Sequence, residues 1–401
     1  MKHKALTLEQ AVERITCGVT PLGTEEVAPG EAGTRPLAAD VRSPIDQPPF
    51  PRSPLDGYAF RGEDSAGASP EQPVRLKVVG KHYAGDPGTT KVGPGEAVRL
   101  FTGAVIPQGA NCVIRQEDTD SGEDTVTLYR AQNPWDNYCY AGEDFKRGDL
   151  LLPAGTVLDY AALGLLAGAG VNSVSVYRYP EVAVLSTGDE LVQPGQFPLP
   201  PGKIYSSNTT LITARLSEFH VPNSGWHVSD DPNLVAERVG ELLGHHDLVI
   251  TTGGVSVGQK DFMAQAVSLL GAETVFHGVM LKPGSPALFA RWEGKYILAL
   301  SGNPFAAATT VELLARPLLA ALSGDESLLP RRTRAVLDTP FGKASKGRRF
   351  IRGRLENGHV TLPAGHASGM LASLVGCNCL IDIPGGSGPL SPGQDVDVVL
   401  L

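Results

Sequence analysis

This 401-residue chain has few of the features that mark zinc-bound, secreted or nucleic-acid-binding proteins. Its five cysteines are odd in number and scattered, without zinc-type spacing, so a reducing, cytoplasmic setting is expected. No block of Lys or Arg stands out from a formal net charge of −9. Because binding to a phosphate backbone needs a basic surface, nucleic acid is not expected as a partner.

Long apolar runs and common nucleotide fingerprints are also missing. No run is expected to reach the length of a transmembrane helix, so no membrane partner is expected. The first residues lead into an amphipathic helix rather than into the apolar segment of a signal peptide. Neither a G-x-G-x-x-G fingerprint nor a P-loop Lys occurs, which argues against a dinucleotide dehydrogenase or a standard nucleoside triphosphatase.

Glycine and proline, by contrast, are abundant, with 47 and 32 copies, which indicates many turns and substantial β structure. The chain is also too long for one typical core. Changes in its pattern predict a multidomain α/β plus β protein with a discontinuous helical N-terminal domain, an inserted β domain, a doubly wound α/β domain and a C-terminal β barrel. The predicted boundaries are 1–44 with 146–178, then 45–145, 179–328 and 329–401.

The segment 251–262, TTGGVSVGQKDF, joins an apolar strand expected at 248–250 to a helix expected at 263–270. Ser256 has the spacing of a capping box that would begin this helix. A glycine turn before a helix N-terminus exposes backbone N–H groups to an anion, and the Asp261 carboxylate suits a hydrated Mg²⁺ held against phosphate oxygens. The same residues also suit a tight turn in an ordinary α/β sheet, with Asp261 as a charge at the helix start.

Short polar segments recur where predicted strands of this domain feed helices. Four segments share this property: 186–188, 206–208, 251–254 and 301–304. Because parallel strands end at one edge of a sheet, where open α/β sheets bind ligands, Glu190, Asp230 and Asp261 are expected to face one crevice. The recurrence favours an anion or nucleotide-like ligand over simple connectivity.

Polar turns in the two predicted β domains have two readings each. Asp56 follows a Pro-rich bend, Thr102 ends a strand, and Asp144 lies in an acidic turn, so each suits an ordinary turn or a functional site. Arg352 and Arg354 share one face of a predicted strand in the last domain. They suit a solvated edge strand protected by charge, or a phosphate contact.

Seven motifs occur along nearly the whole chain in the order found in one known family. They are SPLDGYA at 53–59, TGA at 102–104, GED at 142–144, STGDEL at 186–191, TTGGVSVG at 251–258 followed by Asp261, KPG at 282–284 and GNP at 302–304. Together they resemble the MoeA family, the molybdopterin molybdenumtransferases that include the gephyrin E domain. The GGVSVG and DGYA blocks in combination are specific.

The resemblance implies a four-domain chain, an elongated homodimer and a molybdopterin-binding α/β domain of MogA type. It implies a molybdenum insertase, in which adenylylated molybdopterin and molybdate give molybdenum cofactor and AMP, with Mg²⁺ as cofactor. A MogA-type adenylyltransferase is an implied partner.

Site residues follow from the polar strand ends and from this resemblance. The expected catalytic residues are Asp261, Glu190, Asp56, Asp144 and Thr102. Of these, Asp261 and Glu190 are expected to hold Mg²⁺, and by family likeness Asp56, Thr102 and Asp144 would reach the cleft from the β domain of the other subunit. The expected substrate-binding residues are Thr187, Gly188, Ser207, Asp230, Gly253, Gly254, Ser256, Gly258, Lys282, Gly284, Ser301, Gly302, Asn303, Pro304 and Arg352.

Several positions depart from the family pattern, and most of the changes remove positive charge. Members usually carry Arg where this chain has 139–141, CYA, and Lys where it has Gly278 and Ser285. Ser301 replaces a Pro, and 53–55 reads SPL rather than SAM. Each lost contact between a cation and phosphate would cost about 1.5–3 kcal/mol of binding free energy.

These departures leave alternatives open. The intact acidic and glycine residues favour an active insertase, with Arg348, Arg349 or Arg354 compensating for the lost charges. The missing cations favour a divergent, catalytically weakened paralogue that acts as a pterin-binding or scaffold protein. A MogA-like adenylyltransferase is a third reading, against which the two β domains argue.

Overall fold

The computed structural model describes residues 5–255 and 262–401 and divides the chain into two compact units. One unit consists of Met1–Glu26, Gly33–Ala38 and Ser175–Leu401. The other consists of Val27–Ala32 and Ala39–Val174. The first contains an α/β domain and a β barrel, and the second contains a β sheet with a short helix.

A six-stranded sheet forms the centre of the α/β domain, in the order β13-β10-β14-β18-β17-β15. The strands are β10 (Val182–Thr187), β13 (Asn223–Val228), β14 (Leu248–Thr252), β15 (Glu273–His277), β17 (Leu288–Trp292) and β18 (Lys295–Leu300). The first four in the sheet order are parallel. The remaining strands are antiparallel, because a tight turn joins β17 to β18 and β15 pairs with β17 in the antiparallel sense.

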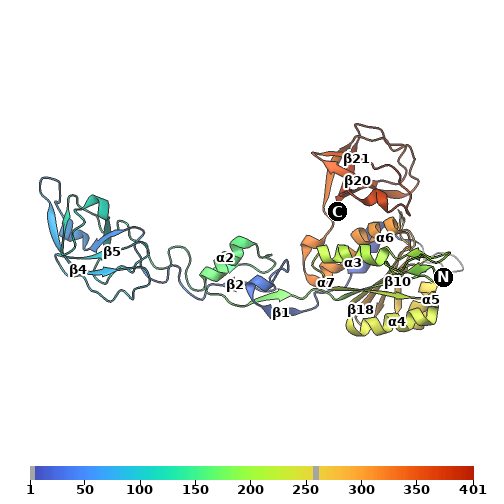
Figure 1. Cartoon of the computed structure of the whole chain (residues 1–401), viewed down its shortest axis with the longest axis horizontal. Helices are drawn as coiled ribbons and strands as arrows, with labels where there is room; N and C mark the ends of the chain where they lie inside the picture. Colours follow the sequence, from blue (N-terminus) through green and yellow to red (C-terminus); the bar gives the residue numbers. More distant parts are fainter. Residues whose placement is uncertain (1–4, 256–261) are drawn as a thin grey trace. The chain divides into compact units, whose positions relative to one another are not determined.

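Helices cover both faces of this sheet, as the doubly wound prediction requires (Figure 1). They are α1 (Leu8–Thr16), α3 (Asn208–Glu218), α6 (Pro304–Thr310) and α7 (Arg316–Ser323) on one side, and α4 (Pro232–His245) and α5 (Phe262–Leu269) on the other. Successive strand residues point to opposite faces. Val184 and Ile250 therefore pack in one buried core, and Leu185 and Val249 in the other.

Local signals fix where several helices begin. Thr7 and Gln10 form a capping box at the start of α1, with hydrogen bonds of 3.2 and 3.0 Å between each side chain and the other residue's backbone N–H. Asp231 caps α4 by accepting from two backbone N–H groups, and Pro232 follows at the first helical position.

One helical stretch corrects the expectation that no apolar run approaches membrane-spanning length. Pro304–Ser323 runs through α6, a π-helical turn at Val311–Ala315 and α7, and it is long and apolar enough to pass that test. However, 89% of its most apolar window is buried inside the protein. Side chains from this stretch and from α1 and α3 belong to the same buried core, so the stretch is a core helix.

The C-terminal strands form the predicted closed barrel. They are β16 (Leu281–Lys282), β19 (Arg332–Leu337), β20 (Arg348–Glu356), β21 (His359–Thr361), β22 (Cys379–Ile383) and β23 (Asp395–Leu400). The ring closes because β20 pairs with both β21 and β22. The reading of β20 as a solvated edge strand was therefore wrong, and Arg352 at its centre is 0% exposed.

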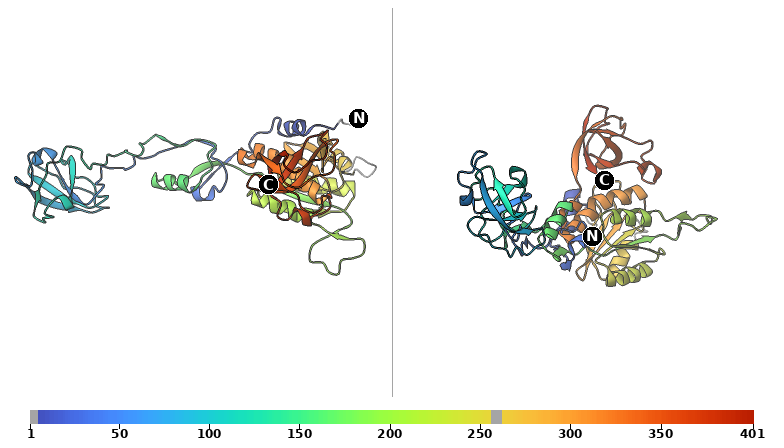
Figure 2. Two further views of the ribbon diagram at one scale, coloured as in Figure 1. Left: turned by 90° about the horizontal axis from the view of Figure 1, so that it is seen from above. Right: turned by 60° about the vertical axis from the view of Figure 1, so that its left-hand side comes forward.

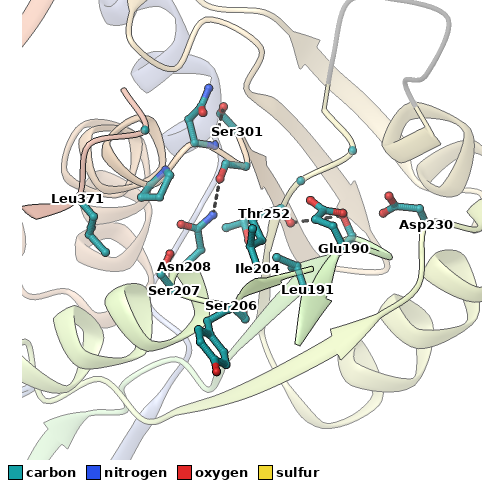
Figure 3. A pocket seen from close by; sticks show the side chains of 18 residues that line it. Glu190, Leu191, Ile204, Ser206, Ser207, Asn208, Asp230, Thr252, Ser301 and Leu371 are labelled. Carbon is teal, nitrogen blue, oxygen red and sulfur yellow. Dashed lines mark hydrogen bonds between the residues drawn. The ribbon is translucent and has the colours of Figure 1, made fainter. Parts of the chain in front are cut away.

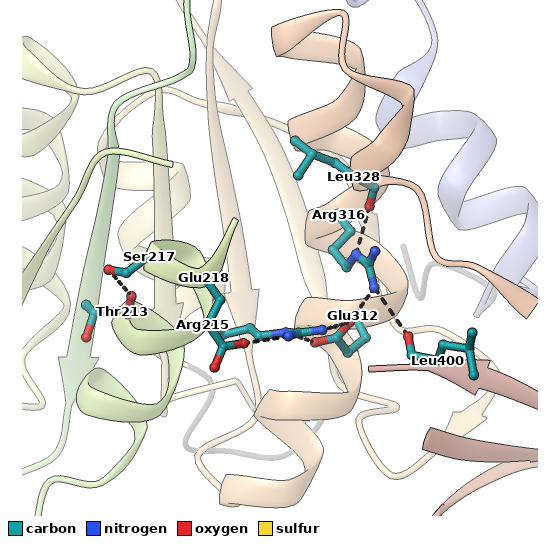
Figure 4. Close-up of polar contacts among 8 residues, drawn as sticks. All are labelled: Thr213, Arg215, Ser217, Glu218, Glu312, Arg316, Leu328 and Leu400. Carbon is teal, nitrogen blue, oxygen red and sulfur yellow. Dashed lines mark hydrogen bonds and ion pairs between the residues drawn. The ribbon is translucent and has the colours of Figure 1, made fainter. Parts of the chain in front are cut away.

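A buried ion network lies midway along the core helix Pro304–Ser323 (Figure 4). Glu312 accepts from the Nε of Arg215 on α3 at 2.7 Å and from Nη1 of Arg316 at 2.8 Å. Arg316 also donates to the carbonyl of Leu328 at 2.7 Å and to that of Leu400 on the last barrel strand at 3.5 Å. The network therefore joins α3, the core helix and the barrel.

One predicted sheet strand lies elsewhere. β12 (Ile204–Tyr205) pairs in parallel with β11 (Leu191–Val192) and does not enter the central sheet. The connection between them extends away from the body of the domain (Figure 2) and carries Phe197, which is 88% exposed. The prediction that all four polar segments follow strands of one sheet was wrong for 206–208.

The second unit contains a five-stranded sheet in the order β6-β3-β5-β4-β7. Its strands are β3 (Gly57–Phe60), β4 (Val74–His82), β5 (Glu96–Leu100), β6 (Cys112–Arg115) and β7 (Thr125–Leu128). The other elements of this unit are β2 (Val41–Arg42), β8 (Leu150–Leu152) and α2 (Tyr160–Gly168). β1 (Thr24–Val27) pairs with β9 (Val174–Tyr177), and most residues of both strands belong to the first unit.

Candidate functional site

A cavity of about 620 Å³ opens at the carboxyl ends of the parallel strands (Figure 3). Thr187 ends β10, Thr252 ends β14, and Ser301 follows β18. Although β12 lies outside the sheet, Ser207 after it also lines the cavity. The remaining lining residues are Glu190, Leu191, Ile204, Tyr205, Ser206, Asn208, Asp230, Gly253, Gly254, Gly302, Asn303, Pro304, Gly369 and Leu371.

Two glycine turns meet on the wall of this cavity. Gly253 has φ +101°, and an added Cβ would lie 2.5 Å from the carbonyl oxygen of Thr187. Gly302 lies close to Gly253, because a Cβ added to Gly302 would be 3.5 Å from the Cα of Gly253. Asn208 at the start of α3 donates from Nδ2 to the carbonyl of Gly302 at 2.8 Å, which holds the second turn in place. Close-packed glycine turns let a ligand approach the backbone directly.

The charges on this cavity are all negative among the residues that the structure describes there, since Glu190 and Asp230 line it without any Lys or Arg. Partial burial, together with the carboxylates of Glu190 and Asp189, raises the pKa of Asp230. Among the described residues that line the cavity, no Lys or Arg offsets the repulsion between these two carboxylates.

This pair suits a hydrated divalent cation. Mg²⁺ usually keeps several waters and uses one or two protein carboxylates together with substrate phosphate oxygens. Within residues 5–255 and 262–401, no group of three or more His, Cys, Asp or Glu side chains is arranged to hold a metal, so an all-protein cage is not present there. Glu190 and Asp230 fit the hydrated form, whereas the predicted ligand Asp261 lies outside the described residues.

A second cavity, of about 1120 Å³, lies between the α/β domain and the barrel, and both cavities include Ser301 and Asn303 in their walls. Its charged side chains are basic, and no Asp or Glu lines it in the described parts of the chain. The cationic residues are Lys282, Lys343, Lys346, Arg348 and Arg349, and His366 lies beside them. Such a wall suits anions, in contrast to the wall of the first cavity.

Only some of the cations are available to a ligand. Arg348 pairs with Asp382 at 2.6 Å and also with Glu9. Arg354 is exposed and pairs with Glu356 at 2.6 Å. The compensation for lost basic residues that the sequence suggested for Arg348 and Arg354 is therefore limited, because both are already neutralised. Among the described residues, Lys282, Arg349 and the two lysines of the β19–β20 loop line the cavity without an ion pair.

Arg352 lies behind this basic wall. Its guanidinium carbon stands 4.2 Å from the centre of the Phe305 ring, and its Nη2 donates to the carbonyl of Ala367 at 2.9 Å. Nε and Nη1 have no hydrogen-bond partner among the described residues. Burial lowers the pKa of Arg352, and burial together with Arg352 and Lys343 lowers the pKa of His366. A fully buried guanidinium with spare donors is a candidate anion ligand.

The second unit holds the other predicted acids. Asp56 accepts from the hydroxyl and the backbone N–H of Thr102 at 2.7 and 2.8 Å, and these two hydrogen bonds lower the pKa of Asp56. Asp144 is exposed in a turn that is tied by its backbone N–H to the carbonyl of Gln47 at 2.9 Å. Arg52 forms backbone bridges to Val105 and to Cys139, so the turns that follow β5 and that precede Asp144 lie on either side of one segment.

The structure thus places the predicted residues in three groups. Thr187, Glu190, Ser207, Asp230, Gly253, Gly254, Ser301, Gly302, Asn303 and Pro304 line the first cavity. Gly188 lies next to it and accepts a hydrogen bond from the His227 ring. Lys282 and Gly284 line the second cavity, and Arg352 lies behind it. Ser256, Gly258 and Asp261 lie outside the described residues.

Some lining residues were not predicted from the sequence. Asn208 was identified only as the last residue of a polar segment. The hydrogen bond from its side-chain amide to the carbonyl of Gly302 joins positions 94 residues apart. Lys343 and Lys346 lie in a loop between two barrel strands and had no local signal other than their charge.

Three family descriptions match successive regions of the chain. "MoeA N-terminal region (domain I and II)" matches residues 6–170, "Probable molybdopterin binding domain" matches 183–321, and "MoeA C-terminal region (domain IV)" matches 334–401.

Whole-length relatives and solved structures are similar to the chain as well. A molybdopterin molybdenumtransferase from Staphylococcus aureus (strain Mu50 / ATCC 700699) is 35% identical over 404 aligned positions, covering 100% of this chain and 96% of that protein. One from Staphylococcus epidermidis (strain ATCC 12228 / FDA PCI 1200) is also 35% identical, with the same coverage of 100% and 96%. The crystal structure of a molybdopterin biosynthesis MoeA protein from Pyrococcus horikosii superposes with a TM-score of 0.88 at 32% identity, covering 99% of each chain.

Proposed function

Because the chain belongs to the MoeA family, with a role in molybdenum cofactor biosynthesis, we propose that it is an active molybdenum insertase. Its substrates would be adenylylated molybdopterin and molybdate, and its products molybdenum cofactor and AMP. A cytoplasmic homodimer that receives its substrate from a MogA-type adenylyltransferase is part of this proposal.

The division of charge between the two cavities is the observation that carries the proposal. One cavity presents only carboxylates and the other mainly cations, and Ser301 and Asn303 belong to both. The proposed reaction needs a metal-binding region beside an anion-binding region, since it uses a phosphoanhydride, a divalent cation and an oxyanion. A sheet edge that contains only connecting turns would not require carboxylates and cations to be separated in this way.

Each group of residues has its own role in the proposed reaction. The turns at Gly253 and Gly302 would bind phosphate oxygens through backbone N–H groups other than that of Gly253, which donates to the carbonyl of Leu300 at 3.2 Å. Lys282 and Arg349 would neutralise further negative charge, and Arg352 has donors to spare behind them. This chain would thereby orient the phosphoanhydride for attack.

Glu190 and Asp230 would hold Mg²⁺, with Asp261 as a further proposed ligand. When bound, the ion supplies Lewis-acid stabilisation of charge on phosphate oxygens. Burial and the carboxylates of Glu190 and Asp189 raise the pKa of Asp230, so this side chain is harder to ionise than an ordinary Asp. Asp56, Thr102 and Asp144 are proposed to contribute to the same reaction.

The proposal is tested by AMP release from adenylylated molybdopterin, with Mg²⁺ and molybdate, catalysed by the purified full-length protein. Glu190→Gln is expected to lower the rate by about 100-fold or more, because metal-assisted stabilisation amounts to several kcal/mol. Glu241→Gln, on the exposed face of α4, is the matched control and should leave the rate unchanged. Wild-type protein that releases no AMP, or an unchanged rate in Glu190→Gln, would contradict the proposal.

A pterin-binding scaffold is the second candidate function. Ser285 stands in the wall of the basic cavity where the family usually has Lys, and the nearby Arg348 is already neutralised by two acids. This candidate predicts that the wild-type protein binds pterin without releasing AMP. Measuring binding and AMP release on one preparation therefore separates the two functions.

A further inference from the structure

Three aromatic side chains of the second unit form one cluster beside the Gly142–Asp144 turn. The ring centroids of Trp135 and Tyr138 are 5.2 Å apart, those of Tyr138 and Tyr140 4.9 Å, and those of Trp135 and Tyr140 5.8 Å. Trp135 is 53% exposed and Tyr140 is 46% exposed. We call this cluster the aromatic face.

The protein holds the aromatic face in a fixed position. Tyr138 is partly buried and packs against the core of the β sheet beside Ala59 and Val98. Trp135 has a φ of 75°, a backbone conformation that residues other than glycine rarely adopt. Its backbone N–H donates to the carbonyl of Asn111 at 2.6 Å. Strained backbone that persists because its surroundings hold it is found often at ligand sites.

Two carboxylate side chains follow the aromatic face in the chain. Glu143 and Asp144 are both exposed, and the N–H of Glu143 donates to the carbonyl of Tyr140 at 3.3 Å. Burial and the Glu143 carboxylate raise the pKa of the neighbouring Cys139 thiol, whereas Arg52, which is bridged to Cys139 through the backbone, lowers it. The carboxylates suit a ligand edge that donates N–H bonds.

We propose that the aromatic face binds a planar nitrogen heterocycle of the substrate, either its pterin or its adenine. Such rings stack on aromatic side chains, and their amino and ring N–H groups donate to carboxylates. Two partly exposed rings offer the area of one heterocycle, far less than the roughly 800 Å² per partner of a stable protein interface. This inference rests on the proposed function, because it names the part of that substrate which this surface recognises.

The test compares ring binding by the full-length wild type with that by Trp135→Leu and Tyr140→Leu. Free pterin and AMP are titrated separately by calorimetry, so that the two rings are distinguished. We expect about tenfold weaker binding of one ligand in each Leu variant, within the range for loss of one stacking contact. Tyr140→Phe should bind within about twofold of the wild type, since it keeps the ring. Tyr160→Leu, at an aromatic position on α2 that is more exposed than either ring, is the control and should show no change.

Tryptophan fluorescence provides a second measurement that needs no Leu variant. The ligand that stacks on the aromatic face is expected to quench the wild-type emission, and Trp135→Phe should abolish this quenching while ligand still binds. If the wild type binds a ring and both Leu variants bind it equally well, the proposed role of the aromatic face is wrong, but the insertase proposal still stands. Failure of the wild type to bind either ligand counts against the insertase proposal itself. Unchanged ring affinity with an altered oligomeric state in Trp135→Leu would identify the face as a protein contact.

Discussion

Single carboxylates carry the sharpest expectations for the first cavity. Burial and the carboxylates of Glu190 and Asp189 raise the pKa of Asp230 above that of an ordinary Asp. A raised pKa in the folded state means that ionisation of Asp230 opposes folding. The stability that depends on protonated Asp230 is therefore present at low pH and is lost as the pH rises through the folded-state pKa. The pKa of the adjacent Asp231 shifts in the opposite direction, because hydrogen bonds from the N–H groups of Leu234 and Asn233 lower it.

This difference gives a paired prediction. Asp230→Asn should raise the melting temperature at pH 7 without Mg²⁺, because the substitution removes the repulsion, and the gain should shrink as the pH is lowered. Asp231→Asn should give no such gain. Added Mg²⁺ should stabilise the wild type by mass action and stabilise Asp230→Asn less. The measurement is thermal melting of both variants over a pH series, with and without the ion; an equal Mg²⁺ effect in wild type and Asp230→Asn would contradict the assignment of Asp230 as a ligand.

At the scale of one element, the turn after β14 depends on a residue without a side chain. Gly253→Ala would place Cβ 2.5 Å from the Thr187 carbonyl oxygen at a φ of +101°, so backbone must move. We expect a loss of about 1–3 kcal/mol of stability and weaker phosphate binding, measured by denaturant unfolding and by AMP titration.

Gly244→Ala is the control for that change. Gly244 lies in α4 with open space around its Cβ position, so alanine should stabilise the helix by roughly 1 kcal/mol. If Gly253→Ala behaves like Gly244→Ala, the close approach of the two turns has no energetic role.

The core helix depends on Glu312. It is 4% exposed and accepts from two arginines, so Glu312→Ala leaves buried positive charge without a partner. The expected loss is about 3–5 kcal/mol, seen as a lower melting temperature of the unit that holds the barrel. Glu218→Ala removes an exposed partner of the same Arg215 and should cost about 0–1 kcal/mol. Equal losses in the two variants would show that the network does not stabilise the helix.

Local patterns predicted most individual elements. Thr7 and Gln10, Asp231 with Pro232, and the turn between β17 and β18 are short-range signals whose hydrogen bonds close within a few residues. The polar strand ends predicted the first cavity for the same reason, since parallel strands finish at one edge. β12 was misassigned because two extended residues do not reveal which strand they pair with.

At the scale of the whole molecule, long-range packing was beyond such patterns. Arg352 looked like a solvated charge on an edge strand, yet barrel closure buries it completely. The basic cavity combines residues around Lys282 with a barrel loop that carries Lys343, about 60 positions later in the chain. Because charge alone does not say which loops meet, the sequence predicted a loss of cations but not which ones remain available.

In the first unit as a whole, carboxylates line one cavity and cations line the other, and Ser301 and Asn303 belong to both walls. Crystals of the protein soaked with Mn²⁺, as a substitute for Mg²⁺, and with molybdate test it directly through anomalous scattering at the manganese and molybdenum edges. We predict manganese at Glu190 and Asp230 and molybdenum beside Lys282 and Arg349. Molybdenum in the carboxylate cavity, or manganese in neither cavity, would contradict the account.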